Sequence, residues 1–163
     1  MKKLLLVLMM VLMASVSFGT AVGVKGGYSA YTGDMSDMSG LAFGADVQFS
    51  MGPLVIAPEI LYSSTSHADS SAFKVNDLAF NVNALFKVPV IGIYGGAGLG
   101  YHSITLEFIG SETTGKLGGQ IIAGYQIDLP AIKPFIEARY VKIFDEEFSD
   151  PRFDLLVGVN LGF

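Results

Sequence analysis

The sequence predicts an all-β fold, namely an eight-stranded antiparallel up-and-down β-barrel that crosses a membrane. After residue 19 the chain contains eight segments in which apolar and polar side chains alternate, which is the pattern of strands with one apolar face. The connections between these segments are alternately short and long, as in transmembrane barrels. The chain is 51% hydrophobic and only 15% charged, whereas soluble domains contain about 25% charged residues.

Residues 1–19 are predicted to be a signal peptide. Lys2 and Lys3 precede an unbroken apolar run over residues 4–13, and small residues follow it. This order is typical of secretory signals, and the run is too short for a membrane helix of about 20 residues. We expect cleavage after Gly19 or Ala21, with residues 20–163 forming one exported barrel domain. A retained membrane anchor is the less favoured alternative.

The eight predicted strands are each about 10 to 14 residues long, enough for a tilted strand to cross a bilayer. Their ranges are 21–31, 41–51, 54–63, 74–87, 91–102, 116–128, 133–143 and 152–163. Three of them show the clearest apolar faces: Phe43, Ala45, Val47 and Phe49; Leu78, Phe80, Val82, Ala84 and Phe86; Phe153, Leu155, Val157, Val159, Leu161 and Phe163. A sheet in lipid must close because its backbone groups cannot stay unpaired, and eight strands leave an interior that side chains can fill.

The connections orient the barrel. Residues 51–53, 88–90 and 129–132 form short turns, and residues 32–40, 64–73, 103–115 and 144–151 form longer polar loops. Because the exported chain starts in the periplasm, the short turns are expected there and the four long loops at the cell surface. Pro58 lies within a predicted strand and cannot donate to the ladder, so we interpret it as a bulge or a register slip.

Aromatic side chains support the membrane frame, since barrels carry aromatic girdles at both interfaces. On the apolar faces one group lies near the loop ends and another near the turn ends. The loop-end group is Tyr28, Phe43, Tyr62, Tyr101, Tyr140 and Phe153, and the turn-end group is Phe49, Phe86, Tyr125 and Phe163.

The C-terminal strand carries a family resemblance. Val157, Val159, Leu161 and Phe163 alternate up to the last residue, and residues 133–140 read KPFIEARY. With the signal peptide and the eight strands, they resemble the small outer-membrane β-barrels of Gram-negative bacteria, such as the OmpA transmembrane domain and OmpX. The resemblance implies an outer-membrane location, surrounding lipid and lipopolysaccharide, and a monomer. It also implies that the barrel assembly machinery reads the terminal alternation ending at Phe163.

Five charged residues are predicted to face the lumen, namely Lys25, Asp46, Glu59, Glu137 and Arg139. They lie three to six residues from the turn ends of their strands, so they are expected in overlapping levels. Buried charges persist only when they are paired. We therefore expect these residues to form an internal salt-bridge network that closes the barrel. The less favoured alternative is a polar path or gate for ions.

The sequence predicts no catalytic, cofactor or metal site. His102 and Ser103 invite comparison with lipid A deacylases, but adjacent strand residues point to opposite faces and cannot readily form a nucleophile–base pair. The glycines between Gly92 and Gly100 do not have dinucleotide-binding spacing. We expect them to make room for a large neighbour across the lumen, with Tyr94 as the candidate, or to bend the strand. The acidic residues 145–150 fit no EF-hand pattern and are interpreted as a solvated loop.

These observations predict a non-enzymatic outer-membrane protein with a structural or surface-interaction role through its four loops. A narrow solute or ion channel is the alternative, and a lipid A-modifying enzyme is a more distant one. The chain contains no cysteine, so thiolate chemistry and disulfides are excluded. Its net charge of −5 argues against a nucleic-acid partner.

Overall fold

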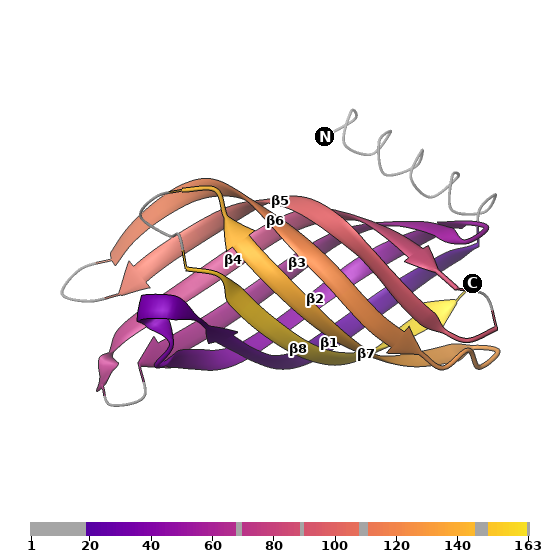
Figure 1. Ribbon diagram of the computed structural model, residues 1–163, viewed down its shortest axis with the longest axis horizontal. Coiled ribbons are helices and arrows are strands. Elements are labelled where there is room, and N and C mark those ends of the chain that lie inside the picture. The colour runs from indigo at the N-terminus through magenta and orange to yellow at the C-terminus, as the bar shows by residue number, and fades with distance from the viewer. Residues whose placement is uncertain (1–18, 68–69, 89, 108–110, 146–149, 163) are drawn as a thin grey trace, which may run out of the picture.

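The computed structural model describes residues 19–67, 70–88, 90–107, 111–145 and 150–162. They form a closed barrel in which each strand pairs antiparallel with its neighbours in the chain, and the first strand pairs with the last (Figure 1). The strands are β1 Thr20–Tyr31, β2 Met38–Met51, β3 Leu54–His67, β4 Ser70–Lys87, β5 Ile93–Glu107, β6 Ser111–Gln126, β7 Ile132–Ile143 and β8 Arg152–Gly162. A short 3-10 helix, Gly33–Met35, follows β1. The predicted fold class is confirmed.

The central strands are longer than predicted at their loop ends. Residues 64–73 and 103–115 were expected to be loops, but most of them extend two hairpins, β3–β4 and β5–β6. The outward side chains there are polar, for example Ser64, Asn76 and Thr105, so the apolar face that marks a strand in lipid ends before the strand does. Inward residues such as Thr65 and Ile104 continue the alternation and are buried.

Below these extensions the barrel turns its apolar side chains outward. Phe43, Tyr101 and Phe153 are each half exposed, as are Phe86 and Tyr125 nearer the turns. Phe43 pairs in register with Tyr62, and Tyr140 packs edge-on against Phe153 with ring centroids 5.1 Å apart. An apolar exterior around a polar interior is the reverse of a soluble barrel and suits a lipid surround. No helix among the described residues is long and apolar enough to cross a membrane.

Pro58 causes neither a bulge nor a register slip, so that expectation was wrong. The β2–β3 register pairs Asp46 with Glu59 and then resumes at Phe49 and Ile56 without any shift. On its other side Pro58 pairs with Val82. Proline has no backbone N–H to donate, and the β2–β3 pairing is absent at Pro58 and at the adjacent Ala57, but β3 continues with its register unchanged.

The β2–β3 and β4–β5 turns contain residues with positive backbone φ values. Gly52 and Gly92 have positive φ values of 64° and 80°, which glycine adopts without steric cost. Val90 also has a positive φ, 73°, which is an outlier for a β-branched residue. This conformation places a fully exposed valine at the tip of the β4–β5 turn.

Candidate functional site

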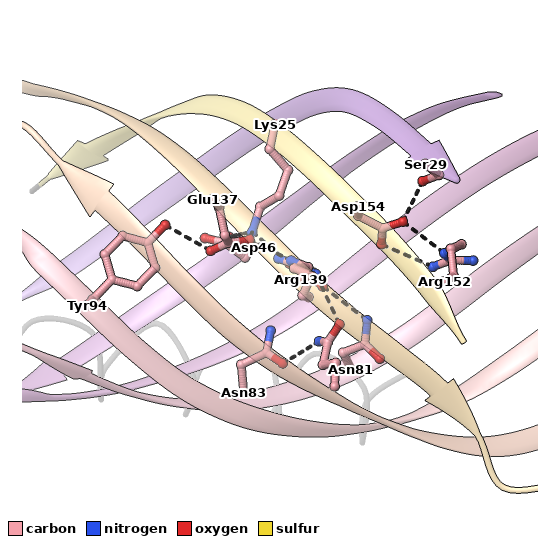
Figure 2. Close-up of polar contacts among 12 residues, drawn as sticks. Lys25, Ser29, Asp46, Asn81, Asn83, Tyr94, Glu137, Arg139, Arg152 and Asp154 are labelled. Atoms are coloured by element: carbon pink, nitrogen blue, oxygen red, sulfur yellow. Dashed lines mark hydrogen bonds and ion pairs between the residues drawn. The ribbon is translucent and has the colours of Figure 1, made fainter. Parts of the chain in front are cut away.

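The lumen holds all five of the charged residues expected there, and it brings them together. Lys25 Nζ lies 2.5 Å from Asp46 Oδ2 and 2.7 Å from Glu59 Oε2. Arg139 donates from Nη1 to Glu59 Oε1 over 2.6 Å and from Nη2 to Glu59 Oε2, and its Nε lies 2.5 Å from Glu137 Oε1. We call these five residues the turn-side cluster; Figure 2 shows Lys25, Asp46, Glu137 and Arg139 converging in the barrel interior.

Neutral side chains complete the hydrogen bonding of the turn-side cluster. Tyr94 donates its hydroxyl proton to Glu137 Oε2 over 2.9 Å, and Asn81 donates to Glu59 Oε1 over 3.0 Å. Gln120 accepts from Arg139 and donates to Asn83 over 2.6 Å. A buried charge pair is stable only if its remaining donors and acceptors are also satisfied, and these amides and the phenol supply most of that satisfaction.

A second cluster, nearer the loops, was not predicted. Arg152 donates from Nη1 to Asp77 Oδ2 over 2.8 Å and from Nε to Asp154 Oδ1 over 2.9 Å. His102 Nδ1 contacts the same oxygen of Asp77 at 2.8 Å, and Ser29 donates to Asp154 over 2.6 Å. We call Asp77, His102, Arg152 and Asp154 the loop-side cluster. The alternation that puts Leu78 and Phe80 on the apolar outer face also places Asp77 inside, so this signal was present in the sequence.

Three apolar layers separate and flank the two clusters along the barrel axis, one at the loop side, one in the middle and one at the turn side. The middle layer consists of Ala42, Leu61, Ala79 and Leu156. The loop-side layer consists of Tyr31, Met38, Val75, Ile104 and Ile143, and the turn-side layer of Val55, Ala57, Leu85, Tyr94 and Ile122. Strand β4 passes each level in turn, with Val75, Asp77, Ala79, Asn81 and Leu85 all buried. The described lumen is therefore filled by side chains of alternating character.

A polar mouth opens at the turn end. A cavity of about 290 Å³ lies there, and Gln48, Lys87, Gln126 and Lys133 are among its lining residues. Lys87 and Gln126 both donate to Asp128, over 2.5 and 2.6 Å. Partial burial favours a higher pKa for the Asp128 carboxyl, but these hydrogen bonds outweigh it and hold the pKa of Asp128 below its usual value. The next cavity inward measures only about 20 Å³ and ends at Tyr94 and Leu85.

Glycines on two strands make room for lumen side chains, though not for the partner expected. The Tyr94 ring lies over Gly124 of β6, where a Cβ would stand 2.3 Å from its Cζ atom. Two of the inward glycines of β5, Gly98 and Gly100, instead lie beneath Asn83 and Asn81. The prediction that Tyr94 fills the space above the β5 glycines was therefore wrong. The Tyr94 ring lies over a glycine of the neighbouring strand β6 and not over the glycines of its own strand β5.

The geometry offers no nucleophile–base pair at His102. The His102 side chain is buried in the lumen against Asp77, whereas Ser103 lies on the outward face. Within the described ranges no group of three or more His, Cys, Asp or Glu could hold a metal ion. Of the acidic loop residues, Asp145 pairs with Lys116 and Asp150 accepts from the Met35 backbone N–H over 2.9 Å. Residues 146–149 lie outside the described structure.

The C-terminal residues are placed in part. Val157 and Leu161 are half exposed on the outward face of β8, and Val159 shares that face. Phe163 and the segment expected to be a signal peptide, residues 1–18, lie outside the described residues.

Comparison with known proteins accounts for this combination of an apolar exterior, a charged interior and eight strands. Residues 4–163 match the family model of the outer membrane protein beta-barrel domain. The chain belongs to this family. A search of curated proteins found no match.

Solved structures show the same fold at low sequence identity. Neisserial surface protein A (NspA) is 14% identical with a TM-score of 0.74, and the match covers 88% of this chain and 97% of that chain. Ail, the attachment invasion locus protein of Yersinia pestis, is 15% identical with a TM-score of 0.60, covering 90% and 99%. The N-terminal barrel of Pseudomonas aeruginosa OprF is 14% identical with a TM-score of 0.57, covering 88% and 97%.

Proposed function

We propose that this outer-membrane barrel is a non-enzymatic surface protein, in which a closed lumen holds the wall rigid and the loop end contacts a partner. The observation that carries the proposal is the filled lumen, in which two charge clusters alternate with three apolar layers. A conducting path would have to separate buried ion pairs and hydrate apolar layers, and breaking a buried pair costs about 3–5 kcal/mol. The loop end remains as the place for interaction.

The chemistry of the loop end favours a partner with positive charge. In the sequence, the four segments predicted to be surface loops (residues 32–40, 64–73, 103–115 and 144–151), with their immediate flanks, contain many acidic residues and few basic ones. The acidic residues are Asp34, Asp37, Asp69, Glu107, Glu112, Asp145, Glu146, Glu147 and Asp150, and the basic ones are Lys74, Lys116 and the buried Arg152. Ail has been solved in complex with the heparin analogue sucrose octasulfate. The acidic loops of this chain would repel such a polyanion, so we expect a different class of partner.

The experiment compares the intact barrel with one in which all four loops are shortened, both in lipid nanodiscs. Binding to immobilised polylysine and to heparin is measured by surface plasmon resonance at two salt concentrations. We expect the intact barrel to bind polylysine, the binding to weaken with salt, and heparin not to be bound. Equal polylysine binding by both barrels, or heparin binding by the intact one, would contradict the proposal. Stable conductance of the intact barrel in a planar bilayer would favour the channel instead.

Export and assembly are part of the same proposal. We place the signal peptide at residues 1–19, because cleavage after Ala21 would remove Thr20 and Ala21, which pair with Phe49 and Gln48. The mass of the mature protein tests this. Deletion of Phe163 should lower the heat-modifiable, membrane-inserted yield without blocking export. Unchanged insertion would show that the terminal alternation does not act as an assembly signal.

A further inference from the structure

A groove runs along the lipid-facing wall over β1 to β4. Its volume is about 490 Å³, and its outward lining residues are Val22, Ala45, Val47, Pro58, Ile60, Phe80 and Val82. Asp46, Glu59 and Asn81 also border it, but their side chains are engaged in the lumen. The surface that the groove offers is therefore apolar.

The groove arises from two small residues between larger ones. Ala45 and Pro58 are its small lining residues, and Ile60 and Phe80, both half exposed, are larger ones. At this level the β2–β3 pairing lapses at Val47 and Gln48, opposite Pro58 and Ala57, and Pro58 has no N–H to donate. Small side chains beside large ones and an interrupted ladder therefore coincide at the hollow.

The depth of the groove identifies what surrounds it. Val47 and Pro58 each lie four residues from the turn ends of their strands, Met51 and Leu54. At about 3.3 Å per residue and a tilt of about 40°, this is about 10 Å from the turn end. Met51 and Leu54 are themselves exposed apolar residues, so contact with hydrocarbon begins near the turns. The groove therefore lies within the leaflet on the turn side of a hydrocarbon core about 30 Å thick.

We propose that this groove is a binding site for one acyl chain of a phospholipid in the turn-side leaflet. A lipid chain against a flat apolar wall contacts protein on one side only and exchanges freely with other lipids. A chain lying on Ala45 and Pro58 is also flanked by Ile60 and Phe80, and each added close contact contributes dispersion energy that a neighbouring lipid lacks. The site concerns the wall of the barrel and does not depend on the proposed surface-contact role.

The test is spin-label electron paramagnetic resonance of the full barrel in phosphatidylcholine vesicles that contain chain-labelled phosphatidylcholine. Ala45→Trp and Pro58→Phe each place a large ring in the groove, and Pro58→Phe also restores a backbone donor. The matched control is Ala123→Trp, because Ala123 is an exposed outward residue of β6 that does not line the groove. Heat-modifiable migration on gels establishes that each variant is folded.

We expect the motionally restricted lipid component of the wild-type spectrum to fall in both groove variants and to be kept in Ala123→Trp. A restricted component that is equal in all four proteins would overturn the proposal, as would an equal loss in the Ala123→Trp control. If Ala45→Trp fails to fold, Pro58→Phe decides the outcome by the same comparison.

Discussion

Glu59 on β3 and Arg139 on β7 form a two-pronged ion pair across the full width of the lumen, since these strands lie opposite each other in the ring of eight. Arg152 on β8 repeats the arrangement with Asp77 on the opposite strand β4. Each arginine also bonds a carboxylate two residues away on its own strand, at Glu137 or Asp154. Two arginines thus tie opposite walls of the barrel together at two levels.

Removing the guanidinium of Arg139 should destabilise the barrel strongly. Arg139 is only 1% exposed, and its loss leaves Glu59 and Glu137 with Lys25 as the nearest cation. Breaking a buried pair from one side costs about 3–5 kcal/mol, so Arg139→Ala should lower the free energy of unfolding by that amount. Urea unfolding in lipid vesicles measures it.

The matched control is Lys142→Ala, because Lys142 is an exposed residue of the same strand and exposed pairs contribute less than about 1 kcal/mol. Adding Glu59→Ala, or separately Glu137→Ala, to Arg139→Ala should restore part of the loss, since each removes one buried carboxylate that lacks its partner. Strict additivity of Arg139→Ala with both partners would show that the cross-lumen pairing does not contribute to stability.

The two clusters should behave as independent units. Arg152 and Asp77 share an ion pair. In the described structure Arg152 and Glu59 share neither a hydrogen bond nor an ion pair, and they lie on either side of the middle layer formed by Ala42, Leu61, Ala79 and Leu156. Alanine variants of Arg152 and Asp77 should therefore show a coupling energy of about 0.5–3 kcal/mol, and those of Arg152 and Glu59 should add. Double-mutant cycles by urea unfolding measure both, and coupling of equal size in the two cycles would contradict the layered lumen.

Gly124 should not tolerate a methyl group. An alanine Cβ there would stand 2.3 Å from Tyr94 Cζ, which overpacks the turn-side layer. Overpacking costs about 1–3 kcal/mol, so Gly124→Ala should lower stability by that range. Gly95→Ala is the control, because its Cβ would meet only the Ile122 carbonyl oxygen at 3.5 Å. An equal loss in both variants would mean that glycine acts through the backbone and not by accommodating Tyr94.

Val90 should be a site where substitution stabilises the barrel. Its φ of 73° lies in the left-handed region, which costs an L-residue about 1–2 kcal/mol. Asparagine tolerates this conformation, so Val90→Asn should raise the free energy of unfolding by about 1 kcal/mol. Val90→Ile keeps the β-branched side chain and should give no gain. Stabilisation by isoleucine as large as by asparagine would indicate a packing effect in place of relieved backbone strain.

The sequence alone determined that there are eight strands and which of their faces points inward where they cross the lipid, because both follow from a local pattern of period two. The same pattern placed Lys25, Asp46, Glu59, Glu137 and Arg139 inside. The pattern did not reveal the parts of β3 and β4 on the loop side of Tyr62 and Leu78. A strand outside the lipid has no apolar face, although its backbone still pairs with its neighbours.

Only the tertiary structure decided which of these residues meet. Closure of β1 on β8 sets the stagger of the strands, and the stagger places Arg152 opposite Asp77, Tyr94 over Gly124 and the groove over Pro58. No local pattern encodes these contacts, because the partners lie on different strands and their relative height depends on the register around the whole ring. The sequence therefore specifies which side chains fill the barrel, and closure of the sheet specifies how they pair.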